Sequence, residues 1–336
     1  MSRRPHVSAG GALALAMLLV FPQPASAYLK FGVLAGGQQK SLRWAQTPVR
    51  YFVSARSSVP GVLVSDFEAA VARAFAKWQA VPTAAISYQY GGLTVAQPGE
   101  DDGSNTLGFA SHPEMDRVLA STSFLIDNTS GELIESDIFF NSAFAWSVAP
   151  GGEAGRYDLE SIALHEIGHF SGMGHSALGE SELRADGGRD VMSSEAVMFP
   201  IAFNAGSIAG RTLKADDIAG ISDIYPNGNA RQGSVSGRVT KNGAPLYGAH
   251  VVAFDLATHE MVAGFTLSSQ GEFSIGGLLP GPKVIRVEPL DDADLDSFFD
   301  ASQVVDLDFR VLFSDRLIAV PLGGDSGPVT LAVIPK

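Results

Sequence analysis

Three histidines and one glutamate stand at metal-binding spacings within residues 164–176, which read LHEIGHFSGMGHS. His165 and His169 are four positions apart, so on a helix their side chains lie on the same face, one turn from each other. Two imidazoles placed in this way can bind one metal ion at about 2.0–2.1 Å. Glu166 follows the first histidine, where its carboxylate can take a proton from a water molecule that the metal activates.

Gly172 and His175 extend this pattern to a third ligand. Glycine readily adopts positive φ, so Gly172 can end the helix and turn the chain until His175 faces the same ion. Three protein ligands leave a fourth position for water, which is typical of a catalytic zinc site. H-E-x-x-H alone also arises by chance, but a chance origin is much less plausible once the glycine and the third histidine stand at the right spacing. We therefore expect one catalytic Zn²⁺, with Glu166 as general base and three ligands: His165, His169 and His175.

The extended motif H-E-x-x-H-x-x-G-x-x-H resembles the metzincin clan of zinc endopeptidases. RYDLESIA at residues 156–163 and Ser176 after the motif are similar to the matrixin family in particular. Residues 213–225, LKADDIAGISDIY, resemble the helix that closes a matrixin domain. The resemblance extends over residues 40–226 and implies an α+β catalytic domain, in which a twisted mixed sheet packs on the active-site helix.

The segment AVMFP at residues 196–200 resembles the Met-turn of metzincins. The resemblance implies that Met198 supports the metal site from below by packing and is not a ligand. Met192 is a rival for this role, but Met198 has the matching Phe-Pro context. Pro200 stands where some other metzincins carry a tyrosine that reaches the metal, so no fifth ligand is expected.

The same resemblance implies an endopeptidase whose partners are protein or peptide substrates. Residues 135–141, ESDIFFN, stand where matrixins place the edge strand above the cleft, so an extended substrate is expected to pair with this strand. The family's cysteine switch is missing, because the sequence contains no cysteine. Only His112 lies in the region of the family's structural zinc site, so no second zinc is expected.

A secretory signal peptide is predicted at residues 1–27. Arg3 and Arg4 begin it, the apolar run at residues 11–21 is too short to span a bilayer comfortably, and Ala27 ends a small-x-small cleavage site. A membrane anchor is the alternative, but no comparable apolar run appears later. We therefore expect a secreted protein, extracellular or periplasmic, with no stable membrane insertion after cleavage. The formal net charge of −13 argues against nucleic acid or anionic membrane as a partner.

Strands and helices are expected around the motif. The capping box SDFE from Ser65 predicts a helix whose apolar residues recur at helical spacing as far as Trp78. Asp158 is a suitable N-cap for the active-site helix. Residues 179–194 are predicted to form a long loop at one end of the cleft. Four stretches suggest strands: residues 44–53, 85–90, 121–127 and 134–141.

Two acidic segments raise the question of calcium. Residues 101–105, DDGSN, are rich in the oxygen ligands that calcium prefers, and residues 291–296, DDADLD, form an acidic run. Neither has the complete spacing of a known calcium loop. A solvated turn and a solvated loop are the readings that we favour, so Ca²⁺ is only a secondary prediction.

The remainder of the chain is predicted to form a separate all-β domain. Residues 227–233 read as a linker between a catalytic domain at 28–226 and a β-sandwich at 234–336. Short strands separated by turn sequences predict the sandwich, which resembles the carboxypeptidase regulatory-like, transthyretin-like domain. His250 and His259 in this part are expected to pack or to face solvent.

Two other functions compete with a secreted zinc endopeptidase. One is an adhesion or matrix-binding protein that uses the sandwich as a binding module on a protease scaffold. The other is an amidase acting on non-peptide bonds. The intact Glu166 argues against a degenerate protease. Because the predicted sandwich can bury its own core, a chain stopped near Asn229 is expected to fold and cleave short peptides; the alternative is that the sandwich packs on the catalytic domain and shapes its cleft.

Overall fold

The computed structural model describes residues 30–35, 38–185, 187–228, 231–300 and 302–336. The predicted signal peptide lies outside these residues, as does the middle of the predicted linker. No helix in the described ranges is long and apolar enough to cross a membrane.

A five-stranded sheet forms the base of the first part of the chain, and its strand order is β4-β3-β5-β7-β6. Neighbouring strands are parallel except at the β6–β7 pair, which is antiparallel. The edge strand beside the metal site is therefore β6, and the prediction that residues 135–141 form this edge was wrong. Those residues belong to β7, which is paired on both sides, because β6 folds back along it. The strands are β3 (Val49–Ser54), β4 (Tyr88–Thr94), β5 (Thr106–Ala110), β6 (Ala120–Asp127) and β7 (Glu132–Asn141).

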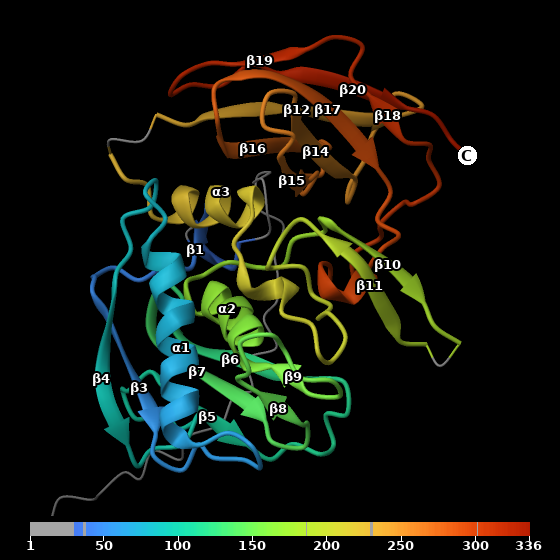
Figure 1. Cartoon of the computed structure of the whole chain (residues 1–336). Helices are drawn as coiled ribbons and strands as arrows, with labels where there is room; N and C mark the ends of the chain where they lie inside the picture. The colour runs from blue at the N-terminus through green and yellow to red at the C-terminus, as the bar shows by residue number, and fades with distance from the viewer. Residues whose placement is uncertain (1–29, 36–37, 186, 229–230, 301) are drawn as a thin grey trace, which may run out of the picture.

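Helix α1 (Val64–Gln79) packs beside helix α2 (Leu159–Phe170), and both lie in front of the sheet in Figure 1. The buried stripe of α1 runs from Phe67 to Trp78, as its apolar spacing predicts. The Trp78 indole N–H donates to the carbonyl of Leu164 at 2.8 Å, which joins the two helices. The helix begins before Ser65, so the predicted cap was wrong: the carboxylate of Asp66 accepts instead from the N–H of Leu63 at 3.2 Å.

Helix α2 begins as the sequence predicts, because the Asp158 carboxylate accepts from the N–H of Ser161 at 2.8 Å. A hairpin of β10 (Gly179–Leu183) and β11 (Arg189–Ser194) follows the metal motif, where a loop was predicted. Helix α3 (Ala215–Ile224) closes this part of the chain. The smaller elements are β1 (Gly32–Ala35), β2 (Gln38–Ser41), β8 (Trp146–Ser147), β9 (Tyr157–Asp158) and η1 (Ala209–Arg211).

The C-terminal part consists of two sheets, which lie at the top of Figure 1. One has the order β13-β12-β16, with β20 beside β12, and the other has the order β15-β14-β17-β18, with β19 beside β17. Side chains from both sheets form one hydrophobic cluster, including Val235, Val251 and Ile285. The elements are β12 (Gly233–Lys241), β13 (Ala244–Pro245), β14 (His250–Asp255), β15 (Met261–Phe265), β16 (Glu272–Leu278), β17 (Gly281–Glu288), η2 (Leu295–Ser297), β18 (Leu312–Phe313), β19 (Ile318–Val320) and β20 (Val329–Val333).

Packing crosses the boundary between the two parts. Ala219 of α3 belongs to the C-terminal cluster, and a Cβ on Gly277 of β16 would lie 2.7 Å from the Cα of Ala219. The Asp216 carboxylate accepts from the backbone N–H of Ala263 in β15 at 2.8 Å. Two smaller clusters also contain residues from both parts. The first joins Ala177 and Phe199 to residues that include Phe265 and Phe298; the second consists of Leu178, Ala196, Val252 and Ala263.

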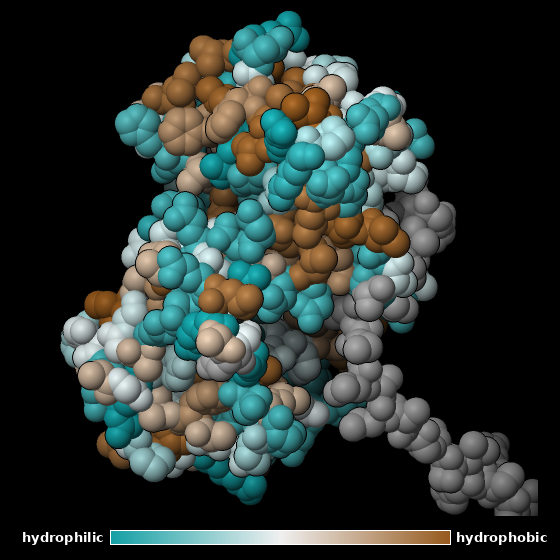
Figure 2. Space-filling model, turned by 90° about the vertical axis from the view of Figure 1, so that its right-hand side faces the viewer, coloured by the Kyte–Doolittle hydropathy of each residue, from teal (hydrophilic) through white to brown (hydrophobic). Residues whose placement is uncertain are grey.

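The surface of the C-terminal part carries exposed hydrophobic side chains. Figure 2 shows brown, hydrophobic side chains gathered in patches over the upper, C-terminal part of one face, with hydrophilic side chains between them. Exposed large hydrophobic residues of this part include Val304, Val311, Phe313, Leu317 and Leu322.

Candidate zinc site

The structure brings His165, His169 and His175 together. Their ligand nitrogens all lie within 4.8 Å of one another, and no other group of three potential metal ligands occurs among the described residues. His165 and His169 lie on α2, and His175 follows the turn at Gly172, which has φ +92°. A Cβ on Gly172 would lie 2.2 Å from the carbonyl oxygen of Leu42, so only glycine fits this turn.

Each histidine ring is held by a backbone carbonyl. The Nδ1 of His165 lies 2.7 Å from the carbonyl oxygen of Val197, and the Nδ1 of His169 lies 2.8 Å from that of Met173. The Nδ1 of His175 lies 2.9 Å from the carbonyl oxygen of Ser297. A carbonyl can only accept, so each Nδ1 carries the proton and each Nε2 keeps a lone pair for a metal.

The electrostatic environment keeps the three rings neutral. Burial, with a smaller contribution from His175, lowers the pKa of His165 to about 3. Burial also lowers the pKa of His169 well below its usual value and lowers that of His175. Neutral imidazoles with free Nε2 atoms are the form that binds a metal, and three of them fit a zinc ion with a remaining open position.

Glu166 lies next to this group but takes no part in it. Its Oε2 accepts a hydrogen bond from the hydroxyl of Thr122 in β6 at 2.6 Å. Burial raises the pKa of Glu166 to about 7, and the hydrogen bond from Thr122 opposes that rise. The sequence motif contains no signal for Thr122, because the contact depends on which strand forms the sheet edge.

Met198 packs against α2. It is 1% exposed, and a Cβ on Gly168 of the motif would lie 2.2 Å from its sulfur. Met192, the rival, is 60% exposed. The backbone N–H groups of Val197 and Met198 donate to the Asp217 carboxylate at 2.8 and 3.1 Å. Asp217 therefore holds the segment whose carbonyl orients His165, a role that the sequence analysis missed.

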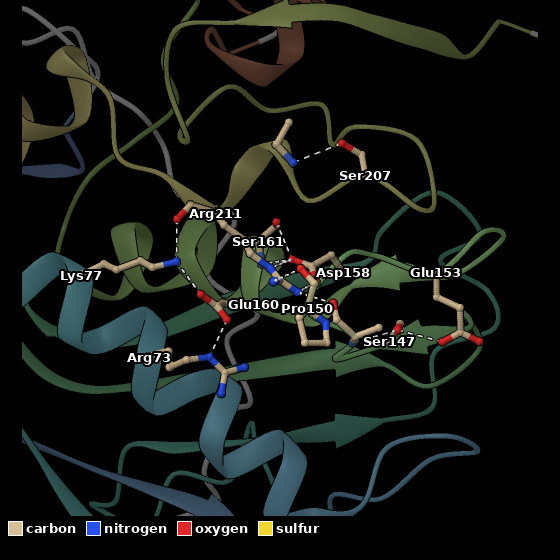
Figure 3. A network of polar contacts seen from close by, with 12 residues as sticks. Arg73, Lys77, Ser147, Pro150, Glu153, Asp158, Glu160, Ser161, Ser207 and Arg211 are labelled. Atoms are coloured by element: carbon tan, nitrogen blue, oxygen red, sulfur yellow. Dashed lines mark hydrogen bonds and ion pairs between the residues drawn. The ribbon is translucent and has the colours of Figure 1, made fainter.

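A second polar network fixes the start of α2, and Figure 3 shows its side chains converging between α1 and η1. Arg211 donates to the Asp158 carboxylate and to the carbonyl of Ala149. Glu160, 4% exposed, forms ion pairs with Arg73 and Lys77 of α1. These contacts fix the helix that carries two of the three ligands.

The site opens on a cleft of about 640 Å³. Strand β6 and the residues before it form one side, and the β10–β11 hairpin and residues 199–204 form others. Phe31 also lines the cleft; its ring centroid lies 5.4 Å from that of His169, and its N–H donates to the carbonyl of Gly172 at 3.1 Å. Two lining residues, Asp294 and Ser297, come from the C-terminal part.

The other predicted residues lie away from the site. In the turn at residues 101–105, the N–H groups of Asp102 and Gly103 donate to the buried carboxylate of Glu135, so the turn is held by a side chain of β7. His250 is buried and lies 3.1 Å from Glu288, whereas His259 is exposed. His112 lies 3.0 Å from Glu114.

The first part of the chain is similar to a known protein family and to proteins named metalloendoproteinases. Residues 43–185 match the model of the family described as Matrixin. Metalloendoproteinase 1 of Glycine max is 31% identical over 180 residues, 48% of this chain and 47% of that protein. Metalloendoproteinase 1-MMP of Arabidopsis thaliana is 26% identical over 210 residues, 58% of this chain and 48% of that protein. The chain thus spans about half the length of these curated relatives, and the matched family segment contains all three histidines and Glu166.

Proposed function

We propose that this protein is a secreted zinc-dependent endopeptidase that cleaves extended polypeptide segments, with Glu166 as its general base. The observation that supports this most strongly is the set of three histidines with carbonyl-bound Nδ1 atoms, beside a buried glutamate, at the floor of an open cleft. Zinc, when bound by these histidines, would polarise the scissile carbonyl and lower the pKa of a water molecule toward about 7.

Glu166 handles the proton in this proposal. A cation held beside its carboxylate lowers the carboxyl pKa from the value of about 7 that burial produces, so the ionised form prevails at neutral pH. The carboxylate then accepts a proton from the attacking water and delivers it to the leaving amine. The Thr122 hydroxyl fixes Oε2 during this transfer and also prefers the ionised form as its acceptor.

The substrate is expected to lie along β6. This strand is bonded to β7 on one side only, and its first residues, 120–122, line the cleft together with residues 116–119 before it. Its outer N–H and C=O groups can pair with an extended chain, so we expect a preference for exposed, unfolded segments. Such pairing involves only the substrate backbone, so any preference for particular substrate side chains must come from the walls of the cleft.

Further parts of the proposal rest on the sequence. The signal-like residues 1–27 support secretion, and the two sheets that share a core support a β-sandwich of the carboxypeptidase regulatory-like kind at 234–336. An adhesion module on an inactive scaffold is the less favoured alternative, because Glu166 keeps both its position and its Thr122 partner. Calcium in the turn at 101–105 stays a prediction for metal analysis.

Cleavage-site profiling tests this function. Purified protein is mixed with a quenched peptide library, with and without a chelator, and Glu166→Gln serves as the matched control. We expect internal peptide-bond cleavage that the chelator abolishes, zinc restores, and the variant lacks. Hydrolysis of non-peptide amides alone would establish an amidase, and zinc binding without any hydrolysis would establish the scaffold alternative.

A further inference from the structure

We infer that the C-terminal part completes the catalytic site: the segment around η2 is a positioning element that orients the third zinc ligand, His175, and forms one wall of the cleft. The inference rests on the proposed zinc site. It goes beyond it because the orienting group lies 122 positions away in sequence and outside the segment that matches the matrixin family.

The three ligands differ in how they are held. Carbonyls of the first part orient two of the ligands. The carbonyl of Val197, next to Met198, orients His165, and that of Met173, four positions further along the chain, orients His169. His175 lies beyond the helix, after the Gly172 turn, so the helix does not fix its ring. The carbonyl of Ser297 supplies the 2.9 Å contact to its Nδ1. The Phe298 ring lies 6.2 Å from the His175 ring, edge to face, and limits its tilt.

Hydrophobic packing anchors this segment to the first part. Phe298 and Phe299 are 3% and 6% exposed and belong to one cluster with Ala177 and Phe199. Phe265 of β15 packs on both phenylalanines, at 5.4 and 5.2 Å between ring centroids. The position of the Ser297 carbonyl is therefore fixed by a core that residues from both parts build together.

Polar contacts anchor the same segment to the hairpin. Arg189 of β11 donates to the Asp294 carboxylate at 3.1 Å and to the carbonyl of Asp291 at 3.2 Å. The N–H of Ser181 in β10 donates to the Asp292 carboxylate at 3.0 Å. The acidic run thus serves to fasten η2 over the cleft, and Figure 1 shows η2 beside β11, well below the sheets to which it is joined in sequence.

Zinc affinity tests the inference, because a carbonyl that orients a ligand acts on metal binding and not only on folding. Phe298→Ala loosens the segment, and Phe273→Ala is its matched control, a phenylalanine 2% exposed in the C-terminal cluster. Both are made in the full chain. Zinc affinity is measured by competition with a chelator, the folded fraction by circular dichroism, and the ligand geometry by the visible spectrum of the cobalt-loaded proteins.

We expect Phe298→Ala to bind zinc about tenfold or more weakly, with an altered cobalt spectrum, since loss of a group that orients a ligand costs about 10–100-fold in affinity. Phe273→Ala should retain both properties of the native protein while folded, and Phe298→Tyr should recover most of the affinity. Arg189→Met, with Arg238→Met as control, provides a second test if Phe298→Ala does not fold.

Affinity within twofold of native in both Phe298→Ala and Arg189→Met, with an unchanged cobalt spectrum, would overturn the inference. An equal loss in the matched controls would also overturn it, because the effect would then be general destabilisation. Failure of the native protein itself to bind zinc is a different result, which refutes the proposed function.

Discussion

The two halves of the candidate site are built in different ways. The helix-borne half, His165 and His169, depends on contacts that the first part makes with itself: the Asp158 cap, the Glu160 ion pairs and the Met198 segment that Asp217 holds. The other half, His175, is oriented by a carbonyl of the C-terminal part. Two adjacent residues of α3 show the same difference. Asp217 binds the Met198 segment of the first part, whereas Asp216 accepts a hydrogen bond from Ala263 in β15 of the C-terminal part. The difference teaches that a family-matched segment need not contain everything that orients its own ligands.

The helix-borne half gives the largest expected effects. Glu166→Ala should lower kcat/KM by about 10²–10⁴-fold while zinc stays bound, because the base and the ligands are different residues. His169→Ala should lose zinc and turnover together. Peptide kinetics and metal content of the two purified variants separate these outcomes. Near-native turnover in Glu166→Ala would contradict the role of this residue.

Removing the C-terminal part is expected to have the next largest effect. A chain ending at Gly228 exposes Leu178 and Phe199, which are 3% exposed in the full chain, at a cost of about 1.5–3 kcal/mol for each large side chain. The sequence alone predicted that such a chain folds and cleaves short peptides. The shared clusters favour the alternative, so thermal unfolding should show a lower midpoint and chelator competition a weaker zinc affinity. Equal values in both chains would restore the picture of two independent domains.

Asp217→Ala tests the internal support of the first half. The substitution leaves the N–H group of the partly buried Val197 and that of the buried Met198 without this acceptor, and an unsatisfied buried group costs about 1–3 kcal/mol. We expect a loss of about 3 kcal/mol in the free energy of unfolding, measured with denaturant. Asp217→Asn keeps one acceptor oxygen and should lose less; an equal loss in both would show that the negative charge, and not the hydrogen bonding, matters.

The smallest expected effect is on the pH dependence of stability, through Asp216, whose carboxylate binds Ala263 of the C-terminal part. Burial raises the pKa of Asp216 to about 8, so the folded protein holds a proton that the unfolded chain has released above about pH 4. Stability should therefore fall as pH rises through this window, by up to about 1.4 kcal/mol per pH unit from this residue.

Asp216→Asn cannot ionise and should remove that share of the slope. Unfolding free energies at pH 6.5 and 7.5, with chelator present throughout, measure it. Some slope should remain, because burial also raises the pKa of Asp217 to about 6 and that of Asp137 to about 7. Identical slopes in the native protein and the variant would show that Asp216 ionises normally in the fold.

The sequence predicted what depends on local spacing. The ligand triad was predicted from helix periodicity and one turn, and the structure brings the three histidines together. The Asp158 cap was predicted from its residue type and position, and it is present. The role of Met198 was implied by the resemblance of residues 196–200 to a Met-turn. The sequence did not predict the partners of those residues. Thr122 reaches Glu166 only because β6, not β7, forms the sheet edge, and strand order is a property of long-range pairing.

The role of Ser297 could not be predicted from the sequence for a further reason. Its carbonyl is a backbone group, so the identity of the residue carries no signal of the contact. The acidic run before it read as a solvated loop, since aspartates are usually exposed. Only the folded hairpin places Arg189 and Ser181 where they bind that run.

The position of Phe31 decides where the protein can be extended for laboratory use. A tag or fusion partner joined directly ahead of Lys30 would begin beside the metal ligands, because Phe31 lines the cleft and is bonded to Gly172. It would compete with substrate for the entrance and, if histidine-rich, for the ion itself. Lys336 is exposed, and the chain ends beside the C-terminal sheets (Figure 1). Lys336 does not line the cleft, so a purification handle is better placed there than ahead of Lys30.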